Sequence, residues 1–407
     1  MRVLLIHQAF VSPQEAGGTR HFEFGRHLVE RGHDVTIVAS DLSYLSGRRA
    51  VDRHGVFAVQ NISGIRVLRA YTYPALHRSF VWRVFSFLSF MASSVWAGLS
   101  TKRPDLVLGT SPPIFQAVSA WLVAAIRRRP FLLEIRDLWP EFAIDMGVLK
   151  NPILIGLSRW LERFLYARAD HVLVNSPAYW DYLLGKGLPP SKISVIPNGV
   201  DPDMFDPHAE GSGVRREFNL NSKFVVTYAG ALGPANDIPV ILRAAERLKN
   251  KTNIHFMLVG DGKERPRLES LAKEMRLPNV TFTGARPKSE MGEFLAASDA
   301  CIAILMNIPM FRTTYPNKVF DYMAAGRPTI LAIDGVIRKV VETAGGGLFV
   351  PPGNDFALAE AVKSLADDPN KARIMGRSAR DYVVRHFNRQ SHVREFTELI
   401  EKFCRKN

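Results

Sequence analysis

Cysteine is nearly absent from this sequence, which has only Cys301 and Cys404 among its 407 residues. This scarcity excludes a disulfide scaffold and a cysteine-rich metal site, and it fits a reducing cytosol. A secretory signal is also missing, because the stretch Met1–His7 is too short and becomes polar too soon. We interpret this stretch as a first buried strand and expect a cytoplasmic protein.

Acidic residues are too few to balance the charge. The chain has 53 lysines and arginines against 39 acidic residues, a formal net charge of +14. The excess leans toward the first half, where residues 1–200 hold 23 basic and 14 acidic side chains. Such a surplus favours nucleic acid, an anionic membrane surface or an acidic substrate as partner. No nucleic-acid-binding motif occurs, so we expect no nucleic acid.

Short Val/Ile/Leu runs alternate with amphipathic segments, which indicates an α/β fold with doubly wound parallel sheets. The chain is too long for one hydrophobic core, so we expect two domains. A proline-rich linker separates residues 1–197 from residues 198–385, and a C-terminal helix at 386–407 should pack back toward the first domain. The expected strands are 2–6, 35–39, 106–109, 131–135 and 171–175, then 224–229, 254–259, 280–283, 300–305, 329–332 and 347–350.

The most informative stretch is a short helix between Pro316 and Gly326, which Pro328 helps to end. Lys318 lies in its first turn, where a cation opposes the helix dipole. The conflict disappears if an anion binds the free N–H groups and Lys318 neutralises it. Asp321 follows one turn later and could accept hydrogen bonds from hydroxyls beside that anion. A nucleotide would fit, and so would a solvated lysine on an ordinary helix.

Glycine-containing loops follow several expected strands, at the edge where doubly wound sheets bind ligands. Gly17 and Gly18 precede the first helix, and Gly230 follows the first strand of the second domain. A Gly-Asp-Gly turn ends at Gly262, but Arg265 stands where a dinucleotide fingerprint would have its third glycine. These turns let a backbone approach a ligand closely, although flexible turns without a ligand explain them equally well.

Arg136 and Asp137 follow the expected strand 131–135. Asp137 could orient a hydroxyl or act as a base, and Arg136 could bind a phosphate with its planar fork. An ion pair that caps the next helix is the structural alternative. The segment Asp201–Asp203 resembles an Asp-x-Asp metal motif, but its place after an Asn-Gly turn favours a structural turn. We expect no metal site.

The segment 79–99 combines many aromatic residues with a serine-bearing side. It lacks about 20 consecutive apolar residues and therefore does not predict a membrane-spanning helix. Two interpretations stay open: a helix in the core of the first domain, or an interfacial helix that enters a membrane surface. The aromatic density and the flanking cations favour the second slightly.

These motifs together resemble the retaining glycosyltransferases of family four, which have the GT-B fold. The resemblance covers nearly the whole chain and rests on Lys192–Asp201, Val259–Gly262 and Gly347–Gly353. Asp137–Glu141 and Pro316–Tyr322 resemble the branch that includes N-acetyl-L-fucosamine transferases of bacterial surface polysaccharide assembly. The family implies two Rossmann-like domains that face a cleft, with the acceptor bound mainly to the first domain and the nucleotide sugar to the second.

The resemblance also implies a chemistry. A nucleotide sugar, expected to be UDP-linked and to carry an N-acetylated amino or deoxy sugar, would donate to a lipid-linked saccharide, as in O-antigen assembly. The enzyme would lie on the inner face of the cell membrane. Stabilising the departing diphosphate would be its main catalytic task, with no metal and no cofactor. The rivals are a GT-B-fold nucleotide-sugar epimerase and a non-catalytic nucleotide-binding scaffold.

Residue by residue, the family's Glu-x7-Glu motif falls on Thr313 and Asp321, so the acid expected at the donor sugar is missing while Asp321 could reach the ribose. The basic pair after the first strand of the second domain is replaced by Ala231 and Asn236. By the same resemblance, Arg136 takes the place of the loop histidine that many family members have in the first domain. The expected catalytic residues are Lys318, Asp137 and Arg136, and the expected donor-binding residues are Gly17, Gly18, Gly230, Gly262, Arg265, Arg286, Thr313, Asn317, Lys318 and Asp321.

Overall fold

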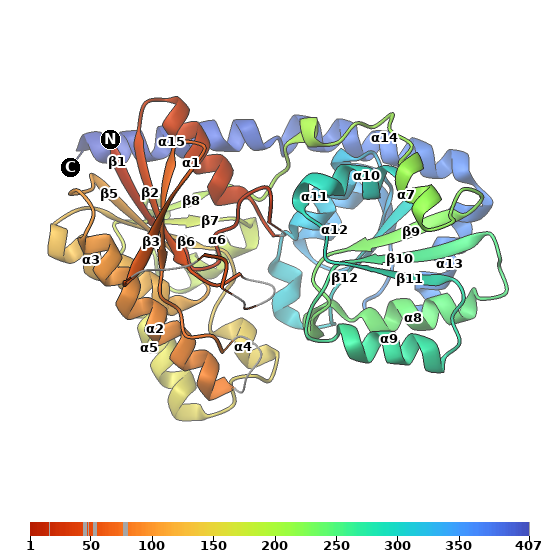
Figure 1. Ribbon diagram of the computed structural model, residues 1–407, viewed down its shortest axis with the longest axis horizontal. Coiled ribbons are helices and arrows are strands. Elements are labelled where there is room, and N and C mark those ends of the chain that lie inside the picture. Colours follow the sequence, from red (N-terminus) through yellow and green to blue (C-terminus); the bar gives the residue numbers. More distant parts are fainter. Residues whose placement is uncertain (16, 44–46, 48, 52–54, 76–79, 407) are drawn as a thin grey trace. The chain divides into compact units, whose positions relative to one another are not determined.

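The computed structural model describes residues 1–15, 17–43, 47, 49–51, 55–75 and 80–406 (Figure 1). It divides the chain into two compact units. Unit 1 contains residues 1–197 and 392–407, and unit 2 contains residues 198–391.

Unit 1 is built on an eight-stranded sheet with the order β3-β4-β2-β1-β5-β6-β7-β8. Every neighbouring pair is parallel except β3 and β4, which form an antiparallel hairpin. The sequence pattern did not predict this hairpin, although its turn, Ser63-Gly64, has positive φ at both residues. The strands are β1 (Arg2–Ile6), β2 (Asp34–Ser40), β3 (Phe57–Ile62), β4 (Ile65–Ala70), β5 (Leu106–Ser111), β6 (Phe131–Ile135), β7 (His171–Val174) and β8 (Ile193–Val195).

Helices cover both faces of this sheet (Figure 1). The first core cluster joins the β1–β2 region to α1 and to the C-terminal helix α15, where Phe24 stacks on Phe396 with 4.4 Å between ring centroids. The helices are α1 (Arg20–Glu30), α2 (Phe80–Leu99), α3 (Ile114–Arg127), α4 (Glu141–Asp145), α5 (Pro152–Arg168), α6 (Pro177–Gly185) and α15 (Arg389–Lys406).

Unit 2 has a six-stranded parallel sheet with the order β11-β10-β9-β12-β13-β14. Buried apolar residues on both faces form two core clusters, as expected for a parallel sheet between helices. The strands are β9 (Phe224–Ala229), β10 (Ile254–Val259), β11 (Val280–Gly284), β12 (Ala300–Ile304), β13 (Thr329–Ala332) and β14 (Gly347–Phe349). The helices are α7 (Ser212–Glu217), α8 (Ile238–Arg247), α9 (Arg265–Glu274), α10 (Met291–Ala296), α11 (Asn317–Ala324), α12 (Val336–Thr343), α13 (Asp355–Asp367) and α14 (Pro369–His386).

The strand orders confirm the expected fold class: each unit is a Rossmann-like α/β domain with a parallel sheet. Each sheet has a point at which the direction of strand addition reverses. In unit 1 it lies between β1 and β5, and in unit 2 between β9 and β12. Ligands of doubly wound sheets bind beyond the carboxyl ends of the strands at such points. The loops after these four strands are therefore the places to look for a site.

Candidate functional site

Lys318 reaches from α11 to the loop after β9, across the reversal point of unit 2. Helix α11 forms because Val319, Phe320 and Tyr322 are buried on one face, while Gly326, at φ 67°, ends it. The Lys318 ammonium donates to the Tyr228 hydroxyl at 2.8 Å and lies 4.2 Å from the centroid of that ring. Burial lowers the pKa of Lys318 to about 7. The lysine is therefore not a solvated helix residue.

The ammonium has a second partner, in the loop after β9. It donates to Asn236 Oδ1 at 3.1 Å. Asn236 is one of the two positions at which the family resemblance led us to expect a basic residue. The charge of Lys318 thus lies next to Asn236, where the family resemblance would place a basic side chain.

Glycines allow the loops after β9 and β10 to pack against each other. Gly260 has φ 146°, and a Cβ there would collide with the carbonyl oxygen of Gly230. Gly230 has φ 155°, and its Cβ would lie 2.8 Å from the Lys318 ammonium. A Cβ on Gly262 would collide with the backbone of Leu232. Gly260 and Gly262 are therefore required by backbone packing, and Gly230 leaves room for the lysine.

The beginning of α11 has no side-chain cap, because Pro316 occupies the N-cap position. Asn317, the first helical residue, has a buried Oδ1 with no hydrogen-bond partner among the described residues. Uncapped N–H groups, an unpaired buried amide oxygen and a nearby ammonium thus occur together. Such a helix start can bind an anion and a neighbouring hydrogen-bond donor.

Asp321 is not free in this structure. Its Oδ2 accepts from the Lys288 ammonium at 2.5 Å, and both side chains are largely shielded from solvent. Thr313, the residue at the other end of the seven-residue spacing, lies in a short 3-10 helix and donates to the Met310 carbonyl at 2.5 Å. A ribose contact by Asp321 stays a prediction, and it would share the carboxylate with Lys288.

The two arginines predicted for donor binding are paired with acids. Arg265 binds Glu269 at 2.7 Å and Asp261 at 3.1 Å. Arg286 contacts Glu217 at 3.2 Å. The charge of each is already partly neutralised, which leaves Lys318 as the stronger candidate for an anion. Their roles in donor binding stay predictions.

His7 and Arg136 meet at the reversal point of unit 1. Arg136 Nη1 lies 3.2 Å from His7 Nε2, and His7 Nδ1 lies 2.9 Å from the Thr110 hydroxyl. An arginine only donates, so Nε2 must accept and Nδ1 must carry the proton. Burial, together with His21 and Arg136, holds the pKa of His7 well below its usual value. His7 is therefore neutral and fixed in one tautomer.

A buried ionic cluster of Glu134, Arg20 and His21 lies next to His7. Glu134, in β6, accepts from Arg20 Nε at 2.9 Å and pairs with His21 Nε2 at 2.5 Å. Burial alone would raise the pKa of Glu134, but His21 and Arg20 outweigh it and hold the pKa well below its usual range. The rings of His7 and His21 lie 4.3 Å apart. The cluster thus fixes α1 against the sheet next to His7.

Asp137 follows Arg136 at the end of β6. Burial raises the pKa of Asp137 to about 6, even though Arg136 opposes the rise. No ion pair forms between Arg136 and Asp137, both of which the structure describes, so the alternative of a capping pair is wrong. Catalytic roles for Arg136 and Asp137 stay predictions.

Gly17 and Gly18, which were predicted to bind the donor, are exposed in the loop before α1. Their role in donor binding stays a prediction.

Sequence reasoning missed three side chains that complete these two places: His7, Tyr228 and Lys288. His7 directly follows the buried strand β1, and Tyr228 is the last residue but one of β9, which is a usable signal for a site residue. Lys288 carries no such signal, because its partner Asp321 lies 33 residues further along the chain. The Asp201–Asp203 segment is a turn, as expected, in which Asp201 accepts from the Asp203 N–H at 3.2 Å.

Comparison with known proteins identifies both units. A glycosyl transferase 4-like domain matches residues 17–199, and a domain of the glycosyl transferases group 1 matches residues 223–368. WcaI of Escherichia coli (strain K12), a protein assigned to colanic acid biosynthesis, is 22% identical over 98% of this chain and 99% of its own length.

Two solved structures share the fold over nearly all of both chains. Sucrose-phosphate synthase from Thermosynechococcus elongatus superimposes with a TM-score of 0.80 at 20% identity and covers 100% of each chain. Anabaena HepE in complex with UDP-glucose superimposes with a TM-score of 0.74 at 18% identity, and covers 99% of this chain and 100% of its own.

Proposed function

This chain belongs to the glycosyltransferases that join a 4-like domain to a group 1 domain, and from this we propose that it transfers a sugar, with retention of configuration, from a nucleoside-diphosphate donor to a lipid-linked saccharide. The donor is UDP-linked and binds unit 2. The acceptor binds unit 1. The sugar is an N-acetylated amino or deoxy sugar, and the product belongs to a bacterial surface polysaccharide, as in the N-acetyl-L-fucosamine transferases.

One observation carries the donor half of this proposal: the Lys318 ammonium lies at the reversal point of unit 2, beside the uncapped start of α11. A diphosphate at that place would gain a charge partner and helix N–H donors together. The choice of UDP is supported by HepE, a protein of the same fold whose structure holds UDP-glucose.

In the proposed reaction, the bond between the sugar C1 and the diphosphate oxygen breaks, and negative charge grows on the leaving diphosphate. Lys318 and the N–H groups of α11 stabilise that charge more strongly than they stabilise the bound donor, which lowers the barrier. The acceptor hydroxyl attacks from the same face, and a diphosphate oxygen takes its proton. This scheme needs neither a metal nor a protein base.

Residues of unit 1 would then position the acceptor. Arg136 donates one N–H to neutral His7 and keeps other donors for an acceptor hydroxyl or phosphate. Asp137, with its pKa raised to about 6, is mainly ionised at neutral pH and can accept from a hydroxyl.

We place the enzyme on the inner face of the cell membrane, where a lipid-linked acceptor would be found. No helix in the described part of the chain could cross a bilayer, so the proposed attachment is peripheral. The similarity to WcaI supports a role in surface polysaccharide assembly.

Isothermal titration with UDP, GDP and uridine, each with and without EDTA, tests the donor half. We expect UDP to bind more tightly than GDP or uridine, and EDTA to change nothing. Incubation with UDP-sugars and lipid-linked saccharides, followed by NMR of the anomeric proton, tests retention. Failure to bind any nucleoside diphosphate would contradict the proposal, and binding without transfer would support the scaffold alternative.

A further inference from the structure

Helix α2 has its polar and apolar sides reversed relative to an ordinary surface helix. Ser86, Ser93 and Ser94 are buried, and Ser93 donates to the Tyr71 carbonyl at 2.7 Å. Four large apolar side chains point outward, although Phe90 is buried: Trp82, Phe85, Leu88 and Trp96 are between 37% and 62% exposed. The buried serines and exposed aromatics go against a helix that lies wholly in the core, and they fit the interfacial alternative, in which the serine side packs on the protein. Contact with a membrane stays a prediction.

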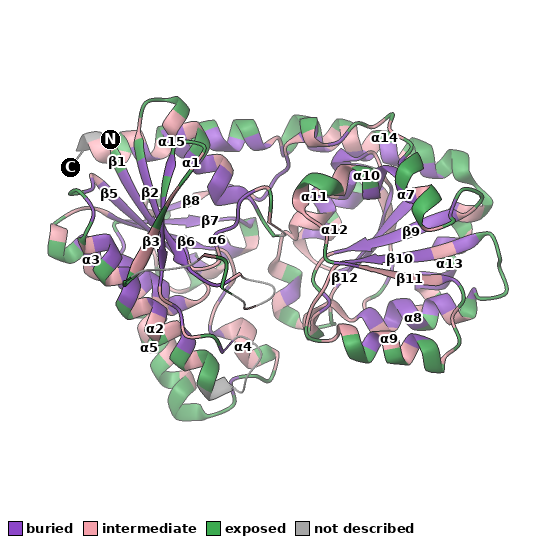
Figure 2. Cartoon of the chain, in the orientation of Figure 1, coloured by how far each residue is buried: buried purple, intermediate pink, exposed green. Residues whose placement is uncertain are grey.

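The first half of α5 shows the same outward display. Ile153 is 72% exposed, Leu157 56% and Trp160 58%, and Leu154 beside them is 43% exposed. These residues follow a helical spacing and form one stripe. Figure 2 shows the corresponding end of α5 as mainly exposed. Isolated exposed apolar residues are ordinary, but stripes on two helices are not.

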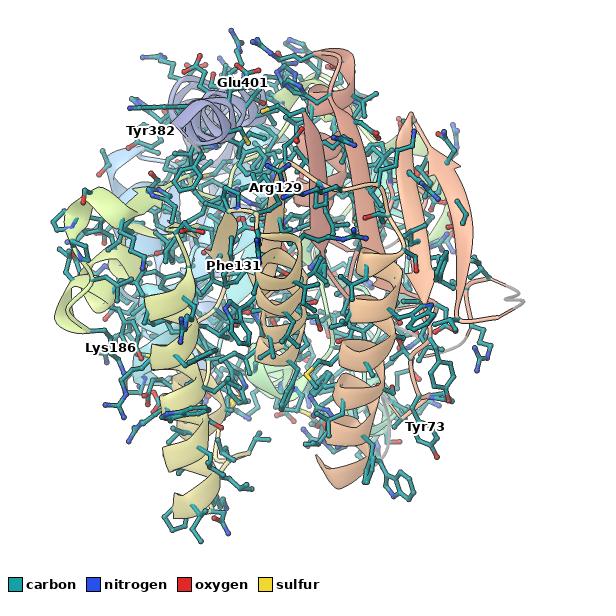
Figure 3. All side chains as sticks on the ribbon, turned by 90° about the vertical axis from the view of Figure 1, so that its left-hand side faces the viewer. Tyr73, Arg129, Phe131, Lys186, Tyr382 and Glu401 are labelled. Carbon is teal, nitrogen blue, oxygen red and sulfur yellow. The ribbon has the colours of Figure 1, made fainter. Side chains whose placement is uncertain are left out.

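The two stripes belong to one face of unit 1. Helices α2 and α5 lie on either side of α3 and extend past its lower end (Figure 3). Aromatic contacts hold the three together: Phe87 of α2 stacks on Phe115 of α3, and Trp121 of α3 meets Phe164 of α5 edge to face. The projecting ends are the N-terminal ends of α2 and α5, at the carboxyl edge of the sheet, where His7 and Arg136 also lie.

The charged side chains of these three helices are mainly basic. Helices α2, α3 and α5 contain Arg83, Arg127, Arg159, Arg163 and Arg168, and their only acid is Glu162. Glu162 is buried and binds the hydroxyl of Tyr166 and the ammonium of Lys186. Arg159 is paired with Glu141 of α4 at 2.9 Å, and Arg127 and Arg168 lie at the C-terminal ends of α3 and α5. The cations that this face adds to its apolar stripes are therefore Arg83 and Arg163. This face complements an apolar layer bordered by negative charge.

We propose that the outward faces of α2 and α5 form a membrane-docking surface, in which Phe85, Leu88, Ile153, Leu157 and Trp160 enter the headgroup region of a bilayer and the arginines bind anionic lipid. Tryptophan and arginine beside an apolar stripe are typical of interfacial helices. A dimer through this face would bring like-charged arginines together, because Glu141 is already paired with Arg159. This surface would hold the acceptor edge of unit 1 next to the lipid, and in that respect it builds on the proposed function.

The test is sedimentation of the full chain with vesicles of phosphatidylcholine alone and with added phosphatidylglycerol. We expect binding only when the anionic lipid is present, and weaker binding at high salt. Ile153→Gln with Leu157→Gln, and separately Phe85→Gln with Leu88→Gln, should each weaken partitioning about tenfold or more. Ile374→Gln with Val384→Gln, a pair that is also exposed but lies on α14, should leave it unchanged.

The contribution of charge is tested with Arg163→Gln, which should weaken binding to the anionic vesicles. Arg377→Gln on α14 is the matched control and should not. Binding of UDP, measured by titration, should be the same in all these variants, so a loss of docking is distinguished from a loss of the donor site. The proposal is overturned if the wild-type chain ignores anionic vesicles, or if the α2 and α5 variants partition like their controls. It is also overturned if those variants abolish only self-association, measured by light scattering.

Discussion

The ammonium of Lys318 lies 2.8 Å from the hydroxyl of Tyr228 and 4.2 Å from the centroid of its ring. The hydroxyl itself donates to the Ala231 carbonyl at 2.8 Å, so it can only accept from the lysine. No carboxylate takes part in these contacts. A buried ammonium held by neutral oxygens and a ring face is under-neutralised, and this is why burial lowers its pKa to about 7. An anion would supply what the lysine lacks.

Lys318→Ala should therefore weaken UDP about 10- to 100-fold and uridine by much less, because the lost interaction is a charge-assisted bond to phosphate. Titration calorimetry with both ligands measures the difference. Lys339→Ala, an exposed lysine of unit 2, is the control and should change neither affinity. Equal losses for UDP and uridine would show that Lys318 does not contact the diphosphate.

The pH dependence of UDP binding should reveal the same group. Free Lys318 loses its proton near pH 7, whereas a bound diphosphate raises its pKa, so binding above pH 7 takes up a proton. UDP affinity should fall as the pH rises from 7 to 9, by up to about tenfold per pH unit. Titrations in two buffers with different ionisation enthalpies count the protons taken up. Uridine binding should show no uptake, and an uptake near zero for UDP would contradict the assignment.

Folding stability should follow the opposite course. The pKa of Lys318 is depressed in the folded protein relative to 10.5, so the unfolded chain binds more protons between about pH 7 and pH 10.5. The contribution of this group is therefore fully present above pH 10.5 and is lost as the pH falls through 7. Lys318→Met should flatten this part of the stability curve. Urea unfolding at pH 6.5 and pH 9 measures it, and an unchanged slope would contradict the buried ammonium.

The features that the sequence predicted correctly are those that depend on neighbouring residues. The two sheets and the first turn of α11 follow from strand periodicity and from Pro316 and Gly326, which act on their own neighbours. The pairing of Lys288 with Asp321 could not be predicted in this way, because no local rule joins a residue after β11 to one in α11. The same holds for His7 and Arg136, which meet only when β1 and β6 take their places in the sheet.

The serine side of α2 shows a different limit. The sequence pattern separated serines from aromatics correctly, but it left two interpretations open. A core helix would bury Trp82 and Phe85, whereas an interfacial helix would pack its serine side on the protein. The structure buries Ser86, Ser93 and Ser94. The Ser93 hydroxyl donates to the Tyr71 carbonyl outside the helix, and the Ser94 hydroxyl donates to the Met91 carbonyl within it.

Asp321→Asn tests the predicted ribose contact. The carboxylate would accept from ribose hydroxyls while it holds Lys288, so the amide should weaken uridine about tenfold and 2′,3′-dideoxyuridine hardly at all. Competition against labelled UDP compares the two nucleosides. Lys288→Met is the companion variant: it removes the neighbour but keeps the carboxylate, and it should preserve the preference for the ribose hydroxyls. If Asp321→Asn weakens the affinity for both nucleosides equally, Asp321 does not contact the ribose hydroxyls, and its ion pair with Lys288 is structural only.

Glu134→Gln tests the buried cluster of unit 1. The amide fits the same space but leaves the buried Arg20 without its counter-charge, and we expect a loss of about 3–5 kcal/mol in the free energy of unfolding. Because the pKa of Glu134 is depressed below 4.5, its contribution to stability is present above that pH and is lost as the pH falls toward the folded pKa. The wild-type chain should therefore lose stability in acid, and the variant should lose less.

Glu30→Gln is the control. It removes an exposed partner of Arg26 in the same unit and should cost under about 1 kcal/mol. Urea titrations at pH 7 and pH 3.5 compare the three proteins, and equal losses in the two variants would show that the Arg20–Glu134 pair does not stabilise the site.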